Sequence, residues 1–199
     1  MTNDAMEPDF EPPREAVRAF DAHVRPAAPA SDDAAAQRPA DLAFEGAEGF
    51  AQALYRVLAH AEAAGARSLC WCDVDFGAWP LGEAGFLEIL TRWARGGGGR
   101  ELVMVAAGYA VIEREHPRFI AWRRDWSHLM RCLEPEESHS LELPTLWIDT
   151  ADQAVRVFDR EHWRGRAGFD RADRQQAREE FDAIAQRGTA AFAAVTLGL

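Results

Sequence analysis

The sequence predicts an α/β fold in which a mixed, largely parallel sheet is flanked by helices. Short apolar segments of strand length alternate with longer segments whose apolar residues recur every three or four positions. Residues 102–107 are continuously apolar, which is typical of a strand buried on both faces. A segment of helical length separates them from the preceding apolar segment at residues 67–76. We therefore expect the two strands to be parallel and joined by a right-handed connection.

The elements are expected in order from residue 41. A short strand at residues 41–45 precedes a helix at about 47–64, and Gly65 is placed to end that helix. A strand at 67–76 is followed by a second helix at about 83–95. The apolar residues of the first helix form one stripe, and those of the second helix are expected to face the same core: Phe50, Leu54, Val57, Leu58 and Ala61, then Phe86, Leu90, Trp93 and Ala94.

The chain between the buried strand and the next strand has helical character over residues 110–126. Pro117 interrupts this stretch or starts a new helix, because proline is tolerated in the first turn of a helix but not in its interior. Residues 128–133 are expected to return to the sheet as a strand.

The last third predicts two strands and a helix. Residues 143–150 and 154–159 are expected to form a hairpin, and residues 170–187 an amphipathic helix with Gly188 at its C-cap. The pattern does not place residues 189–199.

Length and composition indicate one folded domain with a tail. The chain has 199 residues, of which 48% are hydrophobic, which suits one well-buried core. Residues 1–40 are rich in proline, alanine and acids, and they carry few large apolar side chains, so they are expected to be disordered. Residues 41–199 are expected to form a single α/β domain.

The charge of the chain excludes several classes of function. All 22 basic residues are arginine, so the chain contains no P-loop lysine and no Schiff-base lysine. The net charge of -11 disfavours general binding to nucleic acid or to an anionic membrane. No apolar run approaches the roughly 20 residues that span a bilayer.

Three cysteines and an acid-rich start without the pattern of a secretory signal favour the reducing cytoplasm. Cys70 and Cys72 would share one face of a strand, but no second pair of ligands accompanies them, so buried thiols are favoured over a zinc site. No metal or other cofactor is expected.

The order of elements from residue 41 onward, together with residues 142–149, resembles one half of a phospholipase D-like fold. The catalytic segment of that family reads His-x-Lys-x-x-x-x-Asp, and the corresponding residues here are Glu-Leu-Pro-Thr-Leu-Trp-Ile-Asp. Asp149 matches the aspartate, whereas Glu142 and Pro144 stand at the histidine and lysine positions. Phe158, Asp159 and Arg160 occupy the region of the family's Gly-Ser-x-Asn motif.

The resemblance implies a relative without the family's catalytic residues. In the family, histidine attacks phosphorus and lysine stabilises the phosphate oxygens. A glutamate at the first position would repel a phosphodiester, and a proline at the second has no side-chain donor. Single halves of this family commonly pair, so the resemblance implies a homodimer.

Three acids and one histidine are candidate site residues because of the chemistry of their side chains. Asp73 and Asp75 follow a strand and face one side, where they could bind a divalent cation, cap a helix or pair with an arginine. Asp149 could be a functional acid or could hold a turn. His162 lies in the arginine-rich segment 160–166, directly after the predicted hairpin.

The same arginine-rich segment is a candidate for anion binding. Arg160, Arg164 and Arg166 could clamp a phosphate group, or they could be solvated and paired with acids while Trp163 packs on the core.

Three functions follow from these features. A non-catalytic phospholipase D-like domain that binds or assembles with an unknown protein partner is favoured. The alternatives are a phosphodiesterase or metal-assisted hydrolase that uses Asp73, Asp75, Asp149 or His162 in a rearranged site, and binding of a phosphorylated ligand by residues 160–166.

Overall fold

The computed structural model describes residues 41–135, 143–168 and 171–193. The chain divides into two units, Met1–Arg38 and Pro39–Leu199, and every described residue belongs to the second unit. The tail expected at residues 1–40 therefore lies outside the described residues.

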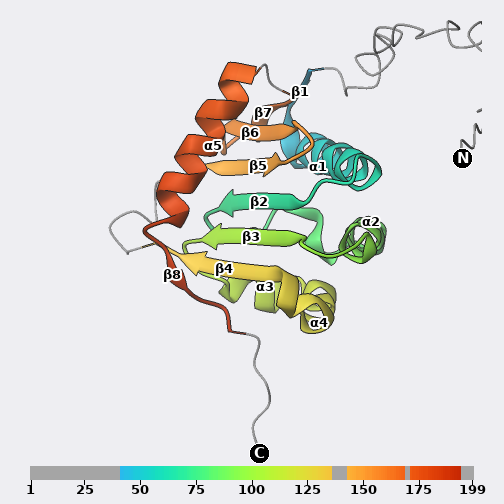
Figure 1. Ribbon diagram of the computed structural model, residues 1–199. Coiled ribbons are helices and arrows are strands. Elements are labelled where there is room, and N and C mark those ends of the chain that lie inside the picture. Colours follow the sequence, from blue (N-terminus) through green and yellow to red (C-terminus); the bar gives the residue numbers. More distant parts are fainter. Residues whose placement is uncertain (1–40, 136–142, 169–170, 194–199) are drawn as a thin grey trace, which may run out of the picture. The chain divides into compact units, whose positions relative to one another are not determined.

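Within the described residues, an open, mixed sheet of eight strands forms the centre of the second unit (Figure 1). The strands lie in the order β1-β7-β6-β5-β2-β3-β4-β8. Their bounds are β1 Leu42–Phe44, β2 Ser68–Asp73, β3 Glu101–Ala106, β4 Met130–Glu134, β5 Thr145–Asp149, β6 Ala154–Asp159, β7 Arg164–Ala167 and β8 Thr189–Ala190.

The predicted α/β class with a mixed sheet is confirmed, but the prediction that the sheet is largely parallel is wrong. Among the described strands only the pairs β2–β3 and β3–β4 are parallel, and the other five neighbouring pairs are antiparallel. The physical reason lies in the short connections after β5 and β6. They are too short for the crossover that a parallel pair requires, so the chain folds back into antiparallel strands.

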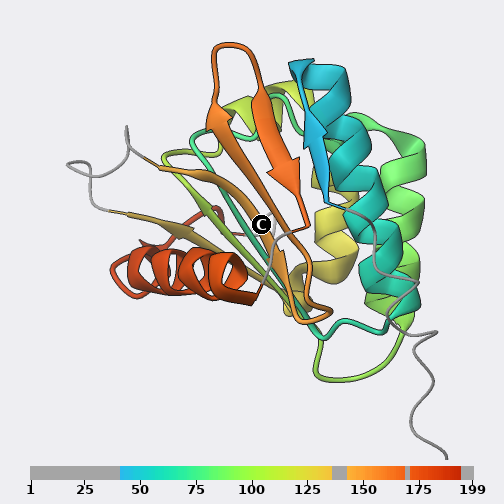
Figure 2. The ribbon, with the colours of Figure 1, turned by 90° about the horizontal axis from the view of Figure 1, so that it is seen from above.

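Helices cover both faces of this sheet (Figure 2). One face carries α1 Gly46–Ala63, α2 Ala84–Arg95, α3 Ala110–Glu115 and α4 Pro117–Trp126, with the 3-10 turns η2 Pro80–Gly82 and η3 Ser127–Leu129. The opposite face carries α5 Arg171–Ala185.

The core between α1, α2 and the sheet is aromatic. Trp71, Trp79, Trp93 and Trp147 are all buried in it. The rings of Trp71 on β2 and Trp147 on β5 stack with centroids 5.2 Å apart. Because side chains alternate along a strand, the neighbours of Trp71 face the other way. Cys70 and Cys72 accordingly pack beneath α5 with Phe181.

The sequence pattern located most of the elements. Each member of the apolar stripe in α1 is buried, Gly65 adopts a positive φ of 70° after the helix, and Pro117 begins α4. The predicted hairpin is β5–β6. The expectation that Gly188 stands at the C-cap of the last helix is wrong, because α5 ends at Ala185. Strands β7 and β8 were not predicted.

Within the described residues, none of the helices is both long enough and apolar enough to cross a membrane.

Candidate functional site

The candidate acids lie at opposite ends of the β2–β5 pair. Asp149 pairs with Leu69 near the start of β2, whereas Leu146 pairs with Cys72 near its end. Leu69 and Asp73 are four residues apart, which corresponds to about 13 Å along a strand. Asp149 therefore does not share a site with Asp73 and Asp75, although the sequence made all three candidates for one rearranged site.

Asp73, Asp75, Thr145 and Arg160 form a polar group at the end of β2, which we call the Asp73 cluster. The Asp73 side chain is fully buried. Its Oδ1 atom accepts hydrogen bonds from the backbone N–H groups of Asp75 and Phe76, each at 3.0 Å. Its Oδ2 atom accepts a hydrogen bond from Thr145 Oγ1 at 2.6 Å. Both carboxylate oxygens are thus engaged by the protein itself.

Arg160 places a positive charge against these carboxylates. Its Nη2 atom lies 3.3 Å from Asp73 Oδ1 and 3.7 Å from Asp75 Oδ1. The Oδ1 atom of Asp75 also accepts a hydrogen bond from the backbone N–H of Gly77 at 2.9 Å. Of the roles open to this acid pair, the geometry matches pairing with an arginine, which balances the charge that a divalent cation would otherwise balance.

Asp149 holds the turn between β5 and β6. Its Oδ1 atom accepts hydrogen bonds from the backbone N–H groups of Ala151 at 2.7 Å and Gln153 at 3.0 Å, and its Oδ2 atom accepts one from Trp147 Nε1 at 3.3 Å. Burial raises the pKa of Asp149 above its ordinary value, although these hydrogen bonds oppose the rise. The geometry matches the turn role rather than contact with a substrate.

His162 forms a pair with Asp159 after the end of β6. Its Nδ1 atom lies 2.9 Å from Asp159 Oδ2, and its backbone N–H donates to Asp159 Oδ1 at 3.1 Å. These contacts, the backbone hydrogen bond first, lower the pKa of Asp159. The His162 side chain is 53% exposed, so its other ring nitrogen can be reached from solvent.

The arginines at 160, 164 and 166 do not converge on one point. Arg164 pairs with Glu45 at 2.8 Å, and Arg166 pairs with Asp41 at 3.0 Å. Trp163, which lies between Arg160 and Arg164 in the sequence, stacks on Phe50 of α1 with ring centroids 5.0 Å apart. A phosphate bound by this segment would have to compete with a carboxylate at each arginine.

The cysteines are buried free thiols. Burial raises the pKa of Cys70 and Cys132, and it raises that of Cys72 well above the ordinary value. In the part of the chain that the structure describes, no three His, Cys, Asp or Glu side chains are grouped so as to hold a metal ion.

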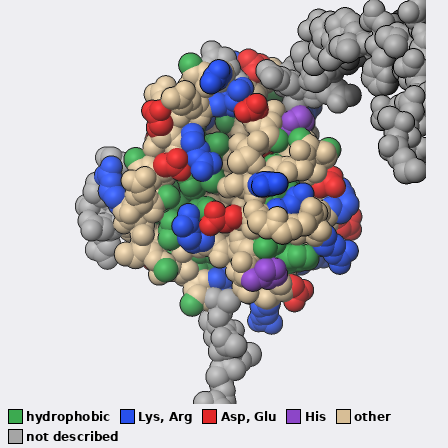
Figure 3. Space-filling view, viewed as in Figure 1, with side chains coloured by type: hydrophobic (Ala, Val, Ile, Leu, Met, Phe, Trp, Pro, Cys, Tyr) green, Lys and Arg blue, Asp and Glu red, His purple; other side chains and the backbone are tan. Residues whose placement is uncertain are grey.

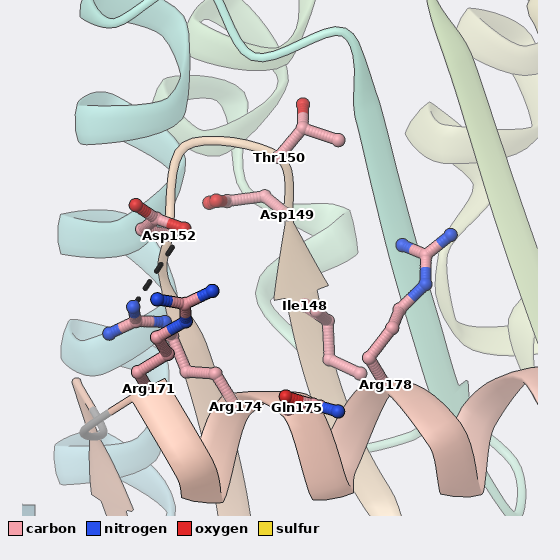
Figure 4. Close-up of a pocket in the computed structure, with 8 residues that line it drawn as sticks. All are labelled: Ile148, Asp149, Thr150, Asp152, Arg171, Arg174, Gln175 and Arg178. Atoms are coloured by element: carbon pink, nitrogen blue, oxygen red, sulfur yellow. Dashed lines mark ion pairs between the residues drawn. The ribbon is translucent and has the colours of Figure 1, made fainter.

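A pocket of about 320 Å³ lies between α5 and the β5–β6 turn, at the same end of β5 as Asp149 (Figure 4). The side chains of Arg171 and Arg174 point from α5 toward this turn, and Arg178 extends toward the neighbouring strand β2. We call this site the arginine pocket; its lining residues are Ile148, Asp149, Thr150, Asp152, Arg171, Arg174, Gln175 and Arg178.

Sequence reasoning did not find this pocket or the role of Thr145. The arginines of α5 are spaced by three and four residues, which places them on one side of the helix. Over the face shown in Figure 3, basic and acidic side chains are interspersed, without one broad patch of a single sign.

The structure describes only part of residues 142–149, the segment from which the phospholipase D-like expectation was drawn. Glu142 lies outside the described residues, Pro144 directly precedes β5, and Trp147 is buried in the aromatic core. Comparison of the chain with protein-family models, with curated proteins and with solved structures finds no significant match.

Proposed function

We propose that this chain is a non-catalytic domain, related to one half of the phospholipase D-like fold, that acts in binding or assembly. The observation that carries the proposal is the state of Asp73. This acid occupies the end of β2, beside the start of β5, and its two oxygens already accept hydrogen bonds from Thr145 and from two backbone N–H groups. Arg160 adds the balancing charge.

Such an arrangement suits a structural role better than acid or base catalysis. A general base must be able to reach the proton that it removes, and a metal ligand must offer a free lone pair to the cation. Asp73 has no exposed surface, and a substrate or metal ion would have to displace Arg160 or Thr145 to reach it.

The experiment that tests this proposal is a hydrolysis assay on a simple phosphodiester, bis(p-nitrophenyl) phosphate, with and without Mg²⁺, Mn²⁺ or Zn²⁺. We expect the wild-type chain, Asp149→Asn and His162→Asn to give the same rate as buffer. A rate above buffer that falls in either variant would contradict the proposal.

One observation favours the alternative of a hydrolase. The contact between His162 and Asp159 resembles the orientation of a general-base histidine by an acid, and the histidine is accessible. If this pair acts in hydrolysis, Asp159→Asn and His162→Asn should reduce the rate together, whereas Asp149→Asn should leave it unchanged.

Assembly as a homodimer in the cytoplasm is part of the same proposal. The free, buried state of the three thiols agrees with a reducing compartment. Sedimentation equilibrium of the full chain over a wide concentration range tests the dimer. A mass of one chain at every concentration would exclude self-association and would leave a different protein as the partner.

A further inference from the structure

Three arginines lie on one side of α5, and two of them, Arg171 and Arg174, point toward the β5–β6 turn. Arg171, Arg174 and Arg178 are separated by three and then four residues, which brings their side chains to the same helical face. They line the arginine pocket together with residues of β5 and of the turn. The pocket therefore concentrates positive charge in a chain whose net charge is -11.

The stability of α5 does not explain why arginines stand in its first turn. The partial positive charge of a helix N-terminus favours acidic side chains there and disfavours basic ones. Arg171 is the first residue of α5, and Arg174 follows within one turn. Asp173 supplies the favourable acidic charge in this turn, whereas the two arginines are disfavoured there unless an anion lies between them.

Acids lie beside two of these arginines, Arg174 and Arg178. Asp152 Oδ1 lies 3.8 Å from Arg174 Nη2, which is longer than the 2.7–2.9 Å of a well-formed charged hydrogen bond. The Asp152 side chain is 68% exposed and that of Arg174 17%, so the acid can turn toward solvent while the arginine stays in place. Arg178 pairs with Asp182 at 3.1 Å, and Arg171 forms no ion pair within the described residues.

Asp149 does not fill the pocket either, because its carboxylate is turned to the backbone N–H groups of Ala151 and Gln153. Thr150 Oγ1 likewise accepts hydrogen bonds from the backbone N–H groups of Arg67 and Ser68. The volume of about 320 Å³ lies at the low end of the range of ligand pockets, which suits a small ligand.

We propose that the arginine pocket binds a phosphate monoester group, with Arg171 and Arg174 as its main donors and Asp152 as the side chain that it displaces. Planar guanidinium groups bind the oxygens of a phosphate through paired hydrogen bonds, and two such groups from one helix face suit a dianion. This site is separate from the Asp73 cluster and from the arginines at 160, 164 and 166.

The test is calorimetric titration of the full chain with glycerol 3-phosphate at constant ionic strength. We expect binding with a Kd on the order of 1 mM or tighter. Arg171→Ala and Arg174→Gln should each weaken binding by about tenfold or more, because each removes charge-assisted hydrogen bonds. Far-UV circular dichroism of both variants checks that α5 still folds.

A gain of affinity provides a further test that does not depend on removing an arginine. Asp152→Asn removes the competing charge, and asparagine tolerates the positive φ of 64° at this position. We expect glycerol 3-phosphate to bind about two to five times more tightly to this variant. Arg187→Ala is the matched control for the two arginine variants, because it lowers the net charge by one unit, as each of them does, but lies outside the pocket.

Several outcomes would overturn the proposal. These are the absence of binding to the wild-type chain, unchanged affinity in Arg171→Ala and Arg174→Gln, weaker binding in Asp152→Asn, and an equal loss in Arg187→Ala. The last result would mean that net charge alone attracts the anion.

The same phosphate group occurs in soluble esters and in the headgroup of phosphatidic acid. Sedimentation with vesicles of phosphatidic acid in phosphatidylcholine distinguishes them. Binding of glycerol 3-phosphate without vesicle binding identifies a soluble ligand, and vesicle binding that Arg171→Ala abolishes identifies the lipid. Neither result bears on hydrolysis, so this proposal and the proposed loss of catalysis fail or succeed separately.

Discussion

Thr145 donates a hydrogen bond of 2.6 Å to Asp73, a residue 72 positions earlier in the chain. The bond joins the start of β5 to the end of β2 and lies in the buried part of the molecule. It shows that the acid at the end of β2 is tied into the sheet. The same bond gives the first prediction.

Thr145→Val should reduce the free energy of unfolding by about 1–3 kcal/mol, because it leaves a buried carboxylate oxygen without its donor while preserving the shape of the side chain. Urea denaturation measures the change. Thr145→Ser is the control, because it keeps the hydroxyl group and should recover most of the loss. An unchanged midpoint in Thr145→Val would mean that Asp73 does not depend on this bond.

Arg160→Met should also destabilise the fold, by about 1–3 kcal/mol, because it removes the positive charge beside buried Asp73. This loss of stability is smaller than that expected for a fully buried ion pair, because the Arg160 side chain is 36% exposed. Arg164→Met is the matched control, since its partner Glu45 is exposed, and little change is expected. Equal effects of the two substitutions on urea denaturation would contradict the assigned role of Arg160.

Gly165→Ala should destabilise the protein by about 1–3 kcal/mol through overpacking. A Cβ atom at Gly165 would overlap the backbone oxygen of Arg156 and the ring of Phe44, so β7 would have to move away from its neighbours. Gly98→Ala is the control, because a Cβ atom there meets nothing within 4 Å. Thermal unfolding of both variants gives the comparison, and equal midpoints would show that β7 does not pack as described.

The stability of the wild-type chain relative to Asp149→Asn should fall as the pH rises above about 3.9, the ordinary pKa of an aspartate. Burial raises the folded-state pKa of Asp149 above that value, so ionisation is penalised in the folded protein. The penalty is absent below the unfolded pKa and complete above the folded one. Urea denaturation at several pH values tests the trend, and a pH-independent difference between the two proteins would contradict it.

The three cysteines should resist thiol reagents in the folded protein and react once it unfolds. All three are buried, and burial raises their pKa values, so the reactive thiolate is scarce. Titration with Ellman's reagent in buffer and in denaturant measures the difference. Rapid reaction of one thiol in buffer would show that one of these sites is open to solvent.

The amphipathic helices and the buried strands could be predicted from the sequence because their signal is local. The stripe of α1 and the apolar run of β3 each specify one buried surface. Strand β7 also buries one set of residues, because its positions alternate between exposed and buried, but the buried residues are Gly165 and Ala167. These small side chains give almost no hydrophobic pattern, so the sequence does not predict a strand here.

The candidate site was predictable only in part, because its geometry depends on contacts between distant segments. The position of Asp73 and Asp75 at the end of a strand follows from the sequence pattern. Their pairing with Arg160 depends on how β6 is placed in the sheet, and the arginine pocket depends on how α5 packs beneath β5. Neither the pairing with Arg160 nor the arginine pocket can be predicted from the spacing of charges along one helix.

The most direct test of the proposed loss of catalysis is a single-turnover experiment with the full chain in excess over bis(p-nitrophenyl) phosphate. Excess protein removes weak binding and slow product release as reasons for a low rate. We predict that p-nitrophenol appears at the rate measured in buffer for the wild-type chain and for His162→Asn alike. Release above the buffer rate by the wild-type chain, lost in His162→Asn, would contradict the account and identify a hydrolase.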